Sequence, residues 1–288
     1  MIKKGFLHIG IFFLYLLSLL PLPILYFFAK IAYLFVYGVI GYRKQVVREN
    51  LTRSFPDKSS AEIISIEKSF FRYLSRLIFE IVKMVSISRT EVKKRVKFYG
   101  LEQVESIFAQ GNSVLACTGH YGNWELCMLA LGMKCSAKSY VIYKPLANET
   151  FENWFQKIRM RYGNVMVAMR QTLRVLVATK DEPTMFCFAS DQTPVREEIQ
   201  YTLEFMNQPT AVLLGLEKIA LQTNRPVFYF DVVVKKNHYE VHCLPLCSVP
   251  RDTKDHEITD LFFEFLTKSI HRDPAYWLWS HRRWKLNA

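Results

Sequence analysis

Short apolar runs alternate with helix-forming stretches from residue 101 onward, and this alternation limits the fold more than any other feature of the sequence. Five runs are short and apolar enough to be buried strands, and they lie at 113–118, 139–143, 165–168, 184–189 and 226–234. The stretches that precede or separate them have helical periodicity, and they cover 101–110, 123–133, 149–162, 170–180 and 211–222. Buried strands that alternate with helices predict an α/β fold, in which helices flank a mixed, mostly parallel sheet.

Elements on either side of this block complete the predicted domain. A strand at 239–246 should pair antiparallel with 226–234, and a helix at 256–271 should follow. Upstream, Ser59 and Glu62 have the spacing of a capping box, and apolar residues then recur every three or four positions as far as Val85. We therefore expect a long amphipathic helix whose apolar face covers the core. An apolar face that rests on a membrane is the alternative.

The amino-terminal segment is much more apolar than the rest of the chain. Gly5 to Ala29 holds no charged residue over 25 positions, and about 20 apolar residues are enough to span a bilayer. The stretch is also longer than the apolar core of a cleaved signal peptide, which is roughly 7–15 residues. The sequence therefore predicts a membrane anchor at 1–42 and a catalytic domain at 43–288.

The path of this anchor stays open at the level of sequence. Pro21 and Pro23 should interrupt a helix in the middle of the apolar stretch. One straight span would place the basic flanks on opposite sides, whereas a hairpin in the inner leaflet, or two helices that lie in it, would keep both flanks on the cytoplasmic side. The flanking basic residues are Lys3, Lys4, Arg43 and Lys44.

The charge of the chain indicates partners that carry negative charge. The 38 Lys and Arg outnumber the 26 Asp and Glu, which gives a net charge of +12. Anionic lipid, nucleic acid or an acidic protein would fit this balance, but the sequence has no zinc finger, helix-turn-helix or aromatic RNA-binding block, so we expect no nucleic acid partner.

An apolar content of 50% excludes a disordered chain. Six cysteines in 288 residues favour reduced, buried thiols over a disulfide framework or a zinc site, so we expect no metal.

The chemistry is concentrated in the sequence G-H-Y-G-N-W-E at 119–125, which joins the strand at 113–118 to a helix. A strand end that leads into a helix is where α/β sheets place their sites. Asn123 is a plausible helix N-cap, and His120 could act as a general base near neutral pH. Glu125 could fix the tautomer of His120 if the histidine lies in the loop and the glutamate in the first helical turn. A loop histidine that is only bonded to backbone is the alternative.

The same segment resembles the H-x-x-x-x-D/E signature of glycerolipid acyltransferases, and in particular of the late, or secondary, acyltransferases of lipid A biosynthesis. Lys144 stands where that family usually has Arg, and Asn207 where it has Gly, which leaves details of acceptor recognition open. Further blocks agree in order along 1–288: N-L with F-P at 50–56, Y-K-P-L-x-N-x-x-F at 143–151, S-D-Q at 190–192, F-M-N-Q-P at 205–209 and W-L-W-S-H-R-R-W-K at 277–285.

The resemblance implies a glycerolipid acyltransferase-like fold and a membrane-bound O-acyltransferase. It implies transfer of a fatty acyl chain from an acyl carrier protein thioester to a hydroxyl of a lipid A precursor, with His120 as base and Glu125 holding its ring. Acyl-CoA is the alternative donor, and no cofactor is expected beyond this co-substrate. Backbone N–H groups after Gly122 would hold the oxyanion. The partners would be acyl carrier protein and a lipid acceptor, at the cytoplasmic face of the bacterial inner membrane.

Several further side chains are candidates for substrate binding. Arginines could bind acceptor phosphate through their planar fork, and the resemblance puts Arg159 first. Asp191 could orient a loop beside the site, and the tail at 277–285 suits either a membrane interface or the core. The candidates are Asn123, Lys144, Arg159, Arg161, Arg170 and Asp191. Acylation of a lysophospholipid or another lipid hydroxyl is the second interpretation, and a non-catalytic membrane adaptor with the same fold is the third.

Overall fold

A seven-stranded sheet forms the centre of the protein, in the order β1-β9-β8-β2-β5-β3-β4. The structure is a computed structural model that describes residues 2–286, with side chains from residue 7 onward, so the Lys3 and Lys4 side chains lie outside the described part. The strands are β1 (Val96–Tyr99), β2 (Val114–Thr118), β3 (Lys138–Tyr143), β4 (Val165–Ala168), β5 (Thr184–Ala189), β8 (Val227–Val234) and β9 (Tyr239–Cys247).

The predicted mixed, mostly parallel sheet is confirmed. Strands β8, β2, β5, β3 and β4 lie next to one another in this order and run parallel to one another. Strand β9 pairs antiparallel with β8, as predicted, and β1 pairs parallel with β9. The sequence analysis missed β1, since four residues that alternate between buried and exposed give too short a signal.

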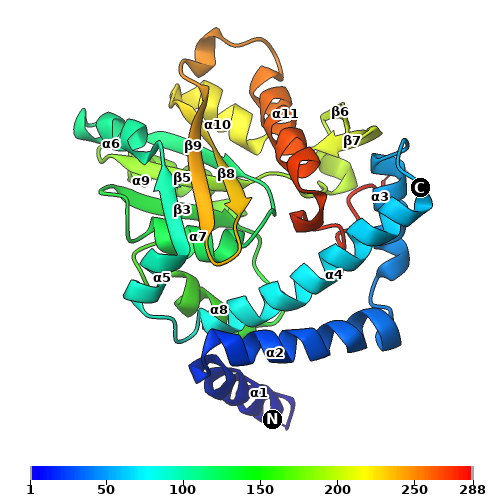
Figure 1. The fold of residues 1–288 in the computed structure, drawn as a ribbon. Helices are drawn as coiled ribbons and strands as arrows, with labels where there is room; N and C mark the ends of the chain where they lie inside the picture. The colour runs from blue at the N-terminus through cyan, green and yellow to red at the C-terminus, as the bar shows by residue number, and fades with distance from the viewer. Residues whose placement is uncertain (1, 287–288) are drawn as a thin grey trace.

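Helices flank this sheet (Figure 1). The last long helix, α11, packs on β8, β9 and β2, while α7 contacts β1 and the neighbouring helices α4, α5 and α8. The helices after the amino-terminal segment are α3 (Lys44–Ser54), α4 (Ser60–Lys83), α5 (Arg89–Arg95), α6 (Leu101–Ala109), α7 (Trp124–Leu131), α8 (Glu149–Arg159), α9 (Thr172–Ala178), α10 (Gly215–Thr223) and α11 (Glu257–Arg272). Short 3-10 turns complete the path at Met169–Gln171, Arg196–Glu198, Pro250–Asp252 and Pro274–Tyr276.

Helix α4 is the predicted long amphipathic helix. Ser59 caps it, and both halves of the capping box with Glu62 are present. Its apolar face is buried against the core, as predicted, with Phe70 and Phe71 at most 2% exposed. The amino-terminal helices cover another part of the α4 surface (Figure 1). Two carboxylates of α4, those of Glu67 and Glu80, are buried.

The amino-terminal segment forms helix α1 (Ile2–Leu19), helix α2 (Leu22–Tyr33) and a π-helical segment η1 (Leu34–Ile40). The helix is interrupted between α1 and α2 at Pro21. This residue is the N-cap of α2, and it has no N–H that could continue a helix. Leu22–Ile40 is long and apolar enough to cross a membrane by length and composition, and only 11% of its most apolar window is buried. Both helices pack on α4 (Figure 1), and Lys83 of α4 donates two 3.0 Å hydrogen bonds to the Ser18 and Leu20 carbonyls at the break.

Two further features concern the carboxyl-terminal half. A hairpin that the sequence analysis did not predict, β6 (Tyr201–Phe205) with β7 (Gln208–Val212), turns through Met206 and Asn207, both with positive φ. All six cysteines are free, as predicted, and four of them are buried, namely Cys117, Cys127, Cys187 and Cys243.

Candidate active site

The candidate site lies at the carboxyl edge of two neighbouring strands, β2 and β5. These strands are parallel, and Thr118 at the end of β2 is the partner of Ala189 at the end of β5. His120 and Asp191 each come two residues after that pair, so both side chains start from the same edge of the sheet. This is where open α/β sheets place ligands.

Asp191 contacts His120 twice. Its Oδ2 accepts the main-chain N–H of His120 at 2.9 Å, and its Oδ1 lies 2.5 Å from His120 Nδ1. Trp277 donates its indole N–H to the same carboxylate, also at 2.9 Å. With Asp191 only 2% exposed, these three donors replace the water that a carboxylate requires. The pair is therefore a fixed part of the fold.

The two groups change each other's proton affinity. Burial alone would raise the pKa of Asp191, but the His120 charge and the hydrogen bonds outweigh it and lower that pKa to about 2. Burial alone would lower the pKa of His120, but the Asp191 charge and hydrogen bond, followed by the Glu125 charge, raise it above 6.5. An ionised aspartate beside the ring favours the imidazolium, which is the state that a general base reaches during a reaction.

The hydrogen bonds assign the tautomer of His120. Because ionised Asp191 only accepts, Nδ1 must carry the proton, which leaves Nε2 with a lone pair. Nε2 lies 3.1 Å from the side-chain nitrogen of Gln192, and the ring is 16% exposed. Nε2 is therefore the atom that could take a proton from a substrate hydroxyl, once that hydroxyl displaces the Gln192 amide. The sequence analysis did not select Gln192, although it follows Asp191 in the resembling block.

The predicted contact between Glu125 and His120 is wrong. Glu125 forms a two-pronged ion pair with Arg159 instead: Arg159 Nε donates to Oε2 at 2.8 Å, and Nη2 donates to Oε1. The Arg159 guanidinium also stacks on the Phe155 ring, 4.1 Å from its centroid. Both charges are close enough to act on the pKa of His120, which Glu125 raises and Arg159 lowers. The sequence predicts only loop orientation for Asp191, but Asp191 is the acid that contacts the imidazole.

Two glycines allow the tight path of the loop around His120. A Cβ at Gly119 would lie 2.5 Å from a methyl group of Leu266. Gly122 has φ +59°, which L side chains rarely adopt, and a Cβ there would lie 2.8 Å from Val232. Substitution at either position would displace the histidine loop.

The carboxyl-terminal tail supports this loop from inside the protein. Gly122 N–H donates to the Tyr276 carbonyl at 3.0 Å, and Leu278 N–H donates to the His120 carbonyl at 3.2 Å. The tail tryptophans are at most 5% exposed, so they do not reach a membrane interface, and the core interpretation of the tail is the correct one. These tryptophans are Trp277, Trp279 and Trp284. Trp277 is the second site residue that the sequence analysis missed.

The other resembling blocks hold the tail and the hairpin. Asn50 donates its amide to the carbonyls of Trp279 and His281, at 2.9 and 3.0 Å. Asn207 donates to the Ser54 carbonyl at 3.0 Å, and its φ of +60° lies where glycine is favoured and asparagine is tolerated. The departure from the family's glycine is therefore a substitution within a turn, and the Asn207 amide bonds to the end of α3.

The remaining predicted substrate residues divide into two groups. Asn123 is fully buried and caps α7, so its side chain cannot contact a substrate in this arrangement. Arg161 donates Nη1 to the carbonyls of Met84 and Val85, both at 2.7 Å, and so holds the turn after α4. Lys144 follows β3 directly, and Arg170 lies in the turn after β4; both are exposed at the carboxyl edge. Because β4 is three strands from β2, roughly 14 Å at 4.8 Å per strand, Arg170 could meet only a large acceptor.

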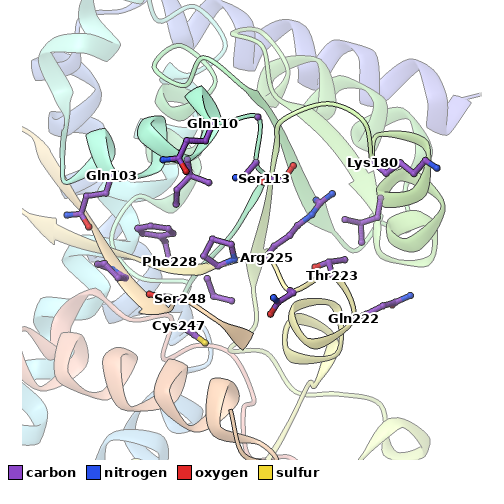
Figure 2. A pocket seen from close by; sticks show the side chains of 18 of the residues that line it. Gln103, Gln110, Ser113, Lys180, Gln222, Thr223, Arg225, Phe228, Cys247 and Ser248 are labelled. Atoms are coloured by element: carbon purple, nitrogen blue, oxygen red, sulfur yellow. The ribbon is translucent and has the colours of Figure 1, made fainter. Parts of the chain in front are cut away.

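A large cavity lies at the opposite edge of the sheet. It has a volume of roughly 1080 Å³ and is lined by residues that precede strands, among them Ser113 and Pro226. Figure 2 shows Ser113, Arg225 and Phe228 on its walls. The length of β2, five residues or about 16 Å, separates this cavity from His120, so the cavity is not part of the candidate site. Among residues 2–286, no group of three His, Cys, Asp or Glu side chains could hold a metal ion.

The fold and the site define an α/β enzyme with a histidine–aspartate pair at the carboxyl edge of its sheet. The chain belongs to the bacterial lipid A biosynthesis acyltransferase family, whose model matches residues 1–286. It is therefore an acyltransferase. It is 25% identical to the lipid A biosynthesis palmitoleoyltransferase of Escherichia coli K12 over 98% of this chain and 94% of that protein. A lipid A biosynthesis acyltransferase of Haemophilus influenzae is 21% identical over 81% of this chain and 74% of that protein.

Proposed function

We propose that the protein transfers a fatty acyl chain from an acyl carrier protein thioester to a hydroxyl of a lipid A precursor, with His120 as general base. The observation that carries this proposal is the His120–Asp191 pair, which leaves Nε2 unprotonated at the carboxyl edge of the sheet. The names of the relatives supply the acceptor class, and the net charge of +12 suits an acidic carrier protein. Acyl-CoA is the alternative donor.

The reaction needs two proton movements, and His120 can perform both. Nε2 takes the proton of the acceptor hydroxyl as the oxygen attacks the thioester carbonyl, which gives a tetrahedral oxyanion and an imidazolium. The negative charge of Asp191 stabilises that imidazolium. When the oxyanion collapses, the C–S bond breaks, the ester remains, and the leaving thiolate takes the proton from Nε2. Backbone N–H groups in the first turn of α7 are the donors that we assign to the oxyanion.

Two exposed cations at the same edge, those of Lys144 and Arg170, support an acceptor that carries phosphate or acidic sugar. Glu125 already occupies the guanidinium group of Arg159, so the main role that we assign to Arg159 is this ion pair. Binding of the acceptor is its secondary role. This changes the order of the candidates from the sequence analysis. A large acceptor could place its hydroxyl at His120 and its negative charge at Arg170, along the carboxyl edge of the sheet.

We also propose that α1 and α2 lie in the inner leaflet at the cytoplasmic face of the bacterial inner membrane. Their outward side chains are apolar and exposed, for example those of Phe12, Phe13 and Phe27. A straight crossing by the helical stretch Leu22–Ile40 is disfavoured because Tyr26 of α2 and Tyr37 of η1 contact the charged residues Glu80 and Glu67 of α4. Helix α4 would then have to follow this stretch into the bilayer. Basic residues at both ends then remain on one side.

The test is acyl transfer by the purified protein, followed by mass spectrometry of the lipid product. Acyl carrier protein thioester and acyl-CoA are compared as donors, and a lipid A precursor and a neutral lysophospholipid as acceptors. His120→Ala should lower the turnover number by about 10²- to 10⁴-fold, the usual contribution of a general base. His238→Ala is the matched control, since His238 lies in the β8–β9 turn and its imidazole pairs with Glu240. Normal turnover by His120→Ala would show that His120 is not the base. Faster acylation of the lysophospholipid than of the lipid A precursor would show that the assigned acceptor class is wrong.

A further inference from the structure

Glu80 of α4 is a buried carboxylate that five side chains from five elements surround. It is 2% exposed. Its Oε1 accepts from Tyr26 Oη at 2.7 Å, Arg76 Nε at 3.0 Å and Arg95 Nη2 at 2.9 Å. Its Oε2 accepts from Asn123 Nδ2 at 2.8 Å and Tyr239 Oη at 2.6 Å. These donors come from α2, α4, α5, the cap of α7 and β9.

The cluster keeps Glu80 ionised. Burial alone would raise the pKa of Glu80, but the charges of Arg95 and Arg76 and the tyrosine hydrogen bonds outweigh it and lower that pKa. A buried carboxylate that accepts from every side is held in one place, because loss of any donor leaves part of its charge without a partner.

Glu80 determines which way the Asn123 amide points. An ionised carboxylate only accepts, so the NH₂ group of Asn123 must face Glu80, and its Oδ1 then faces α7. Oδ1 accepts the Leu126 N–H at 2.9 Å, which is the N-cap bond of α7. The next residue, Trp124, packs edge-on against the His120 ring with centroids 5.0 Å apart. Two hydrogen bonds and one ring contact therefore connect Glu80 to the proposed base.

One donor of the cluster, Tyr26, comes from the apolar amino-terminal segment. The Tyr26 ring stacks under the Arg76 guanidinium, 4.3 Å from Cζ to the centroid, and its hydroxyl also accepts from Arg95 Nη2 at 2.9 Å. The position of α2 against α4 thus determines whether the cluster is complete. The outer side of the same helix exposes Phe27 and Phe28, the side chains that would enter lipid.

We propose that Glu80 is a positioning residue that couples the seating of α2 on α4 to the N-cap of α7 and, through Trp124, to His120. Acyl transfer would then be fastest when α2 is seated as it is here, and would slow when α2 lifts away. This inference rests on the proposed role of His120 for its effect on turnover, but its structural part, the link from Tyr26 to the Leu126 amide, does not.

The chain offers a matched control for this link. Tyr37 lies in the same amino-terminal segment and donates its hydroxyl to another buried carboxylate of α4, that of Glu67, at 2.9 Å. Glu67 is thirteen residues before Glu80 on α4, about 20 Å along the helix axis, and its other partner is Arg48. Tyr26→Phe and Tyr37→Phe therefore remove the same kind of bond, but only the first is connected to α7.

The experiment compares Tyr26→Phe and Tyr37→Phe with Tyr239→Phe, which removes a hydroxyl from Glu80 without touching α2. We measure hydrogen exchange of the Leu126 amide, thermal unfolding, and kcat and KM for the acceptor. Tyr26→Phe and Tyr239→Phe should speed Leu126 exchange and lower kcat by about three- to tenfold, the value of one hydrogen bond. KM should stay unchanged, and Tyr37→Phe should match wild type in exchange and kcat.

Equal behaviour of Tyr26→Phe and Tyr37→Phe would overturn the coupling, as would wild-type exchange at Leu126 in Tyr26→Phe. Faster Leu126 exchange with unchanged kcat would keep the link from α2 to α7 but overturn its effect on the reaction. If His120→Ala is active while Tyr26→Phe speeds Leu126 exchange, the proposed base fails and the link from α2 to α7 stands. The thermal unfolding data separate all of these outcomes from a general loss of stability.

Discussion

Two pairs of oppositely charged side chains lie at the carboxyl edge of the sheet, His120–Asp191 and Glu125–Arg159. They differ in their exposure and in their hydrogen-bond partners. Asp191 is 2% exposed and receives three hydrogen bonds, two from His120 and one from Trp277. The Glu125–Arg159 pair is more open, with the two side chains 10% and 20% exposed, and its contacts are within the pair and to Phe155. Asp191 is therefore built into the core, whereas both side chains of the second pair are partly exposed.

This difference teaches that the nearer acid in sequence is not the partner of the histidine. Glu125 is five residues from His120, and Asp191 is 71 residues away, yet Asp191 makes the contact. Helix α7 carries Glu125 away from the loop and toward α8, where Arg159 meets it. The two acids should therefore have separable effects on the reaction.

The largest effect is expected for Asp191→Asn. The amide could donate to Nδ1 and stabilise the wrong tautomer, and it carries no charge to stabilise the imidazolium. By analogy with other histidine–aspartate pairs, kcat should fall by about 10²- to 10⁴-fold. The measurement is steady-state kinetics, with circular dichroism as the check on folding. A folded Asp191→Asn variant that retains more than a third of wild-type kcat would show that the pair has no part in the reaction.

A smaller effect is expected for Glu125→Gln, because it leaves the His120 pair in place and removes the charge opposite Arg159. The loss of a charged hydrogen bond gives a fall of about 10- to 150-fold in kcat/KM for the acceptor. If Glu125 acts through Arg159, the double variant with Arg159→Gln should be no slower than the slower single variant. Multiplicative losses in the double variant would instead mean that the two residues act independently.

The pH dependence of kcat/KM should distinguish Asp191 from Glu125, because substitution of each acid should shift the acid limb of the profile by a different amount. A base works in its neutral form, so kcat/KM should fall as the pH drops through the pKa of His120, which the Asp191 charge raises above its usual value. Asp191→Asn removes the main cause of the raised pKa, and burial then moves the acid limb to lower pH. Glu125→Gln should move it in the same direction by less, since the Glu125 charge is the weaker cause. The profile of log kcat/KM against pH measures this, and an acid limb that stays in place in Asp191→Asn contradicts the assignment.

The smallest effect is expected for Asn207→Gly, which restores the residue usual in the family. Glycine suits the positive φ of this turn, and the variant loses one hydrogen bond to the Ser54 carbonyl. The free energy of unfolding should change by less than about 1 kcal/mol, and the preference between acceptors should not change. Altered acceptor preference in this variant would place the hairpin in the substrate site after all.

The sequence predicted the elements of the fold better than their arrangement. The runs that became β2, β3, β4, β5 and β8 were found, because a buried strand is apolar along most of its length. Strand β9 was also found, although buried and less buried residues alternate along it. The capping box at Ser59 and the break at Pro21 were also found, because each depends on residues close in sequence. Strand β1 and the β6–β7 hairpin were missed, since β1 and β6 are short and half-exposed, and β7 is short and contains a proline.

The site was predicted only in part for the same reason. His120 could be selected from its own loop, but its partner depends on strand order, which places β5 beside β2. The sequence does show a signal for Asp191, which stands two residues after a buried strand as His120 does. Trp277 gave no such signal, because an aromatic and basic tail is compatible with either a membrane interface or a core.

The sequence by itself determined the α/β class, the apolar amino-terminal segment, the histidine loop and the resemblance to lipid A acyltransferases, because each of these depends on local composition or on a short motif. Only the tertiary structure decided which acid holds His120, that the tail tryptophans are buried, and that Glu80 joins α2 to the cap of α7. These last features depend on contacts between residues 43 to 159 positions apart. Such contacts follow from how strands and helices pack, and packing is a property of the whole chain.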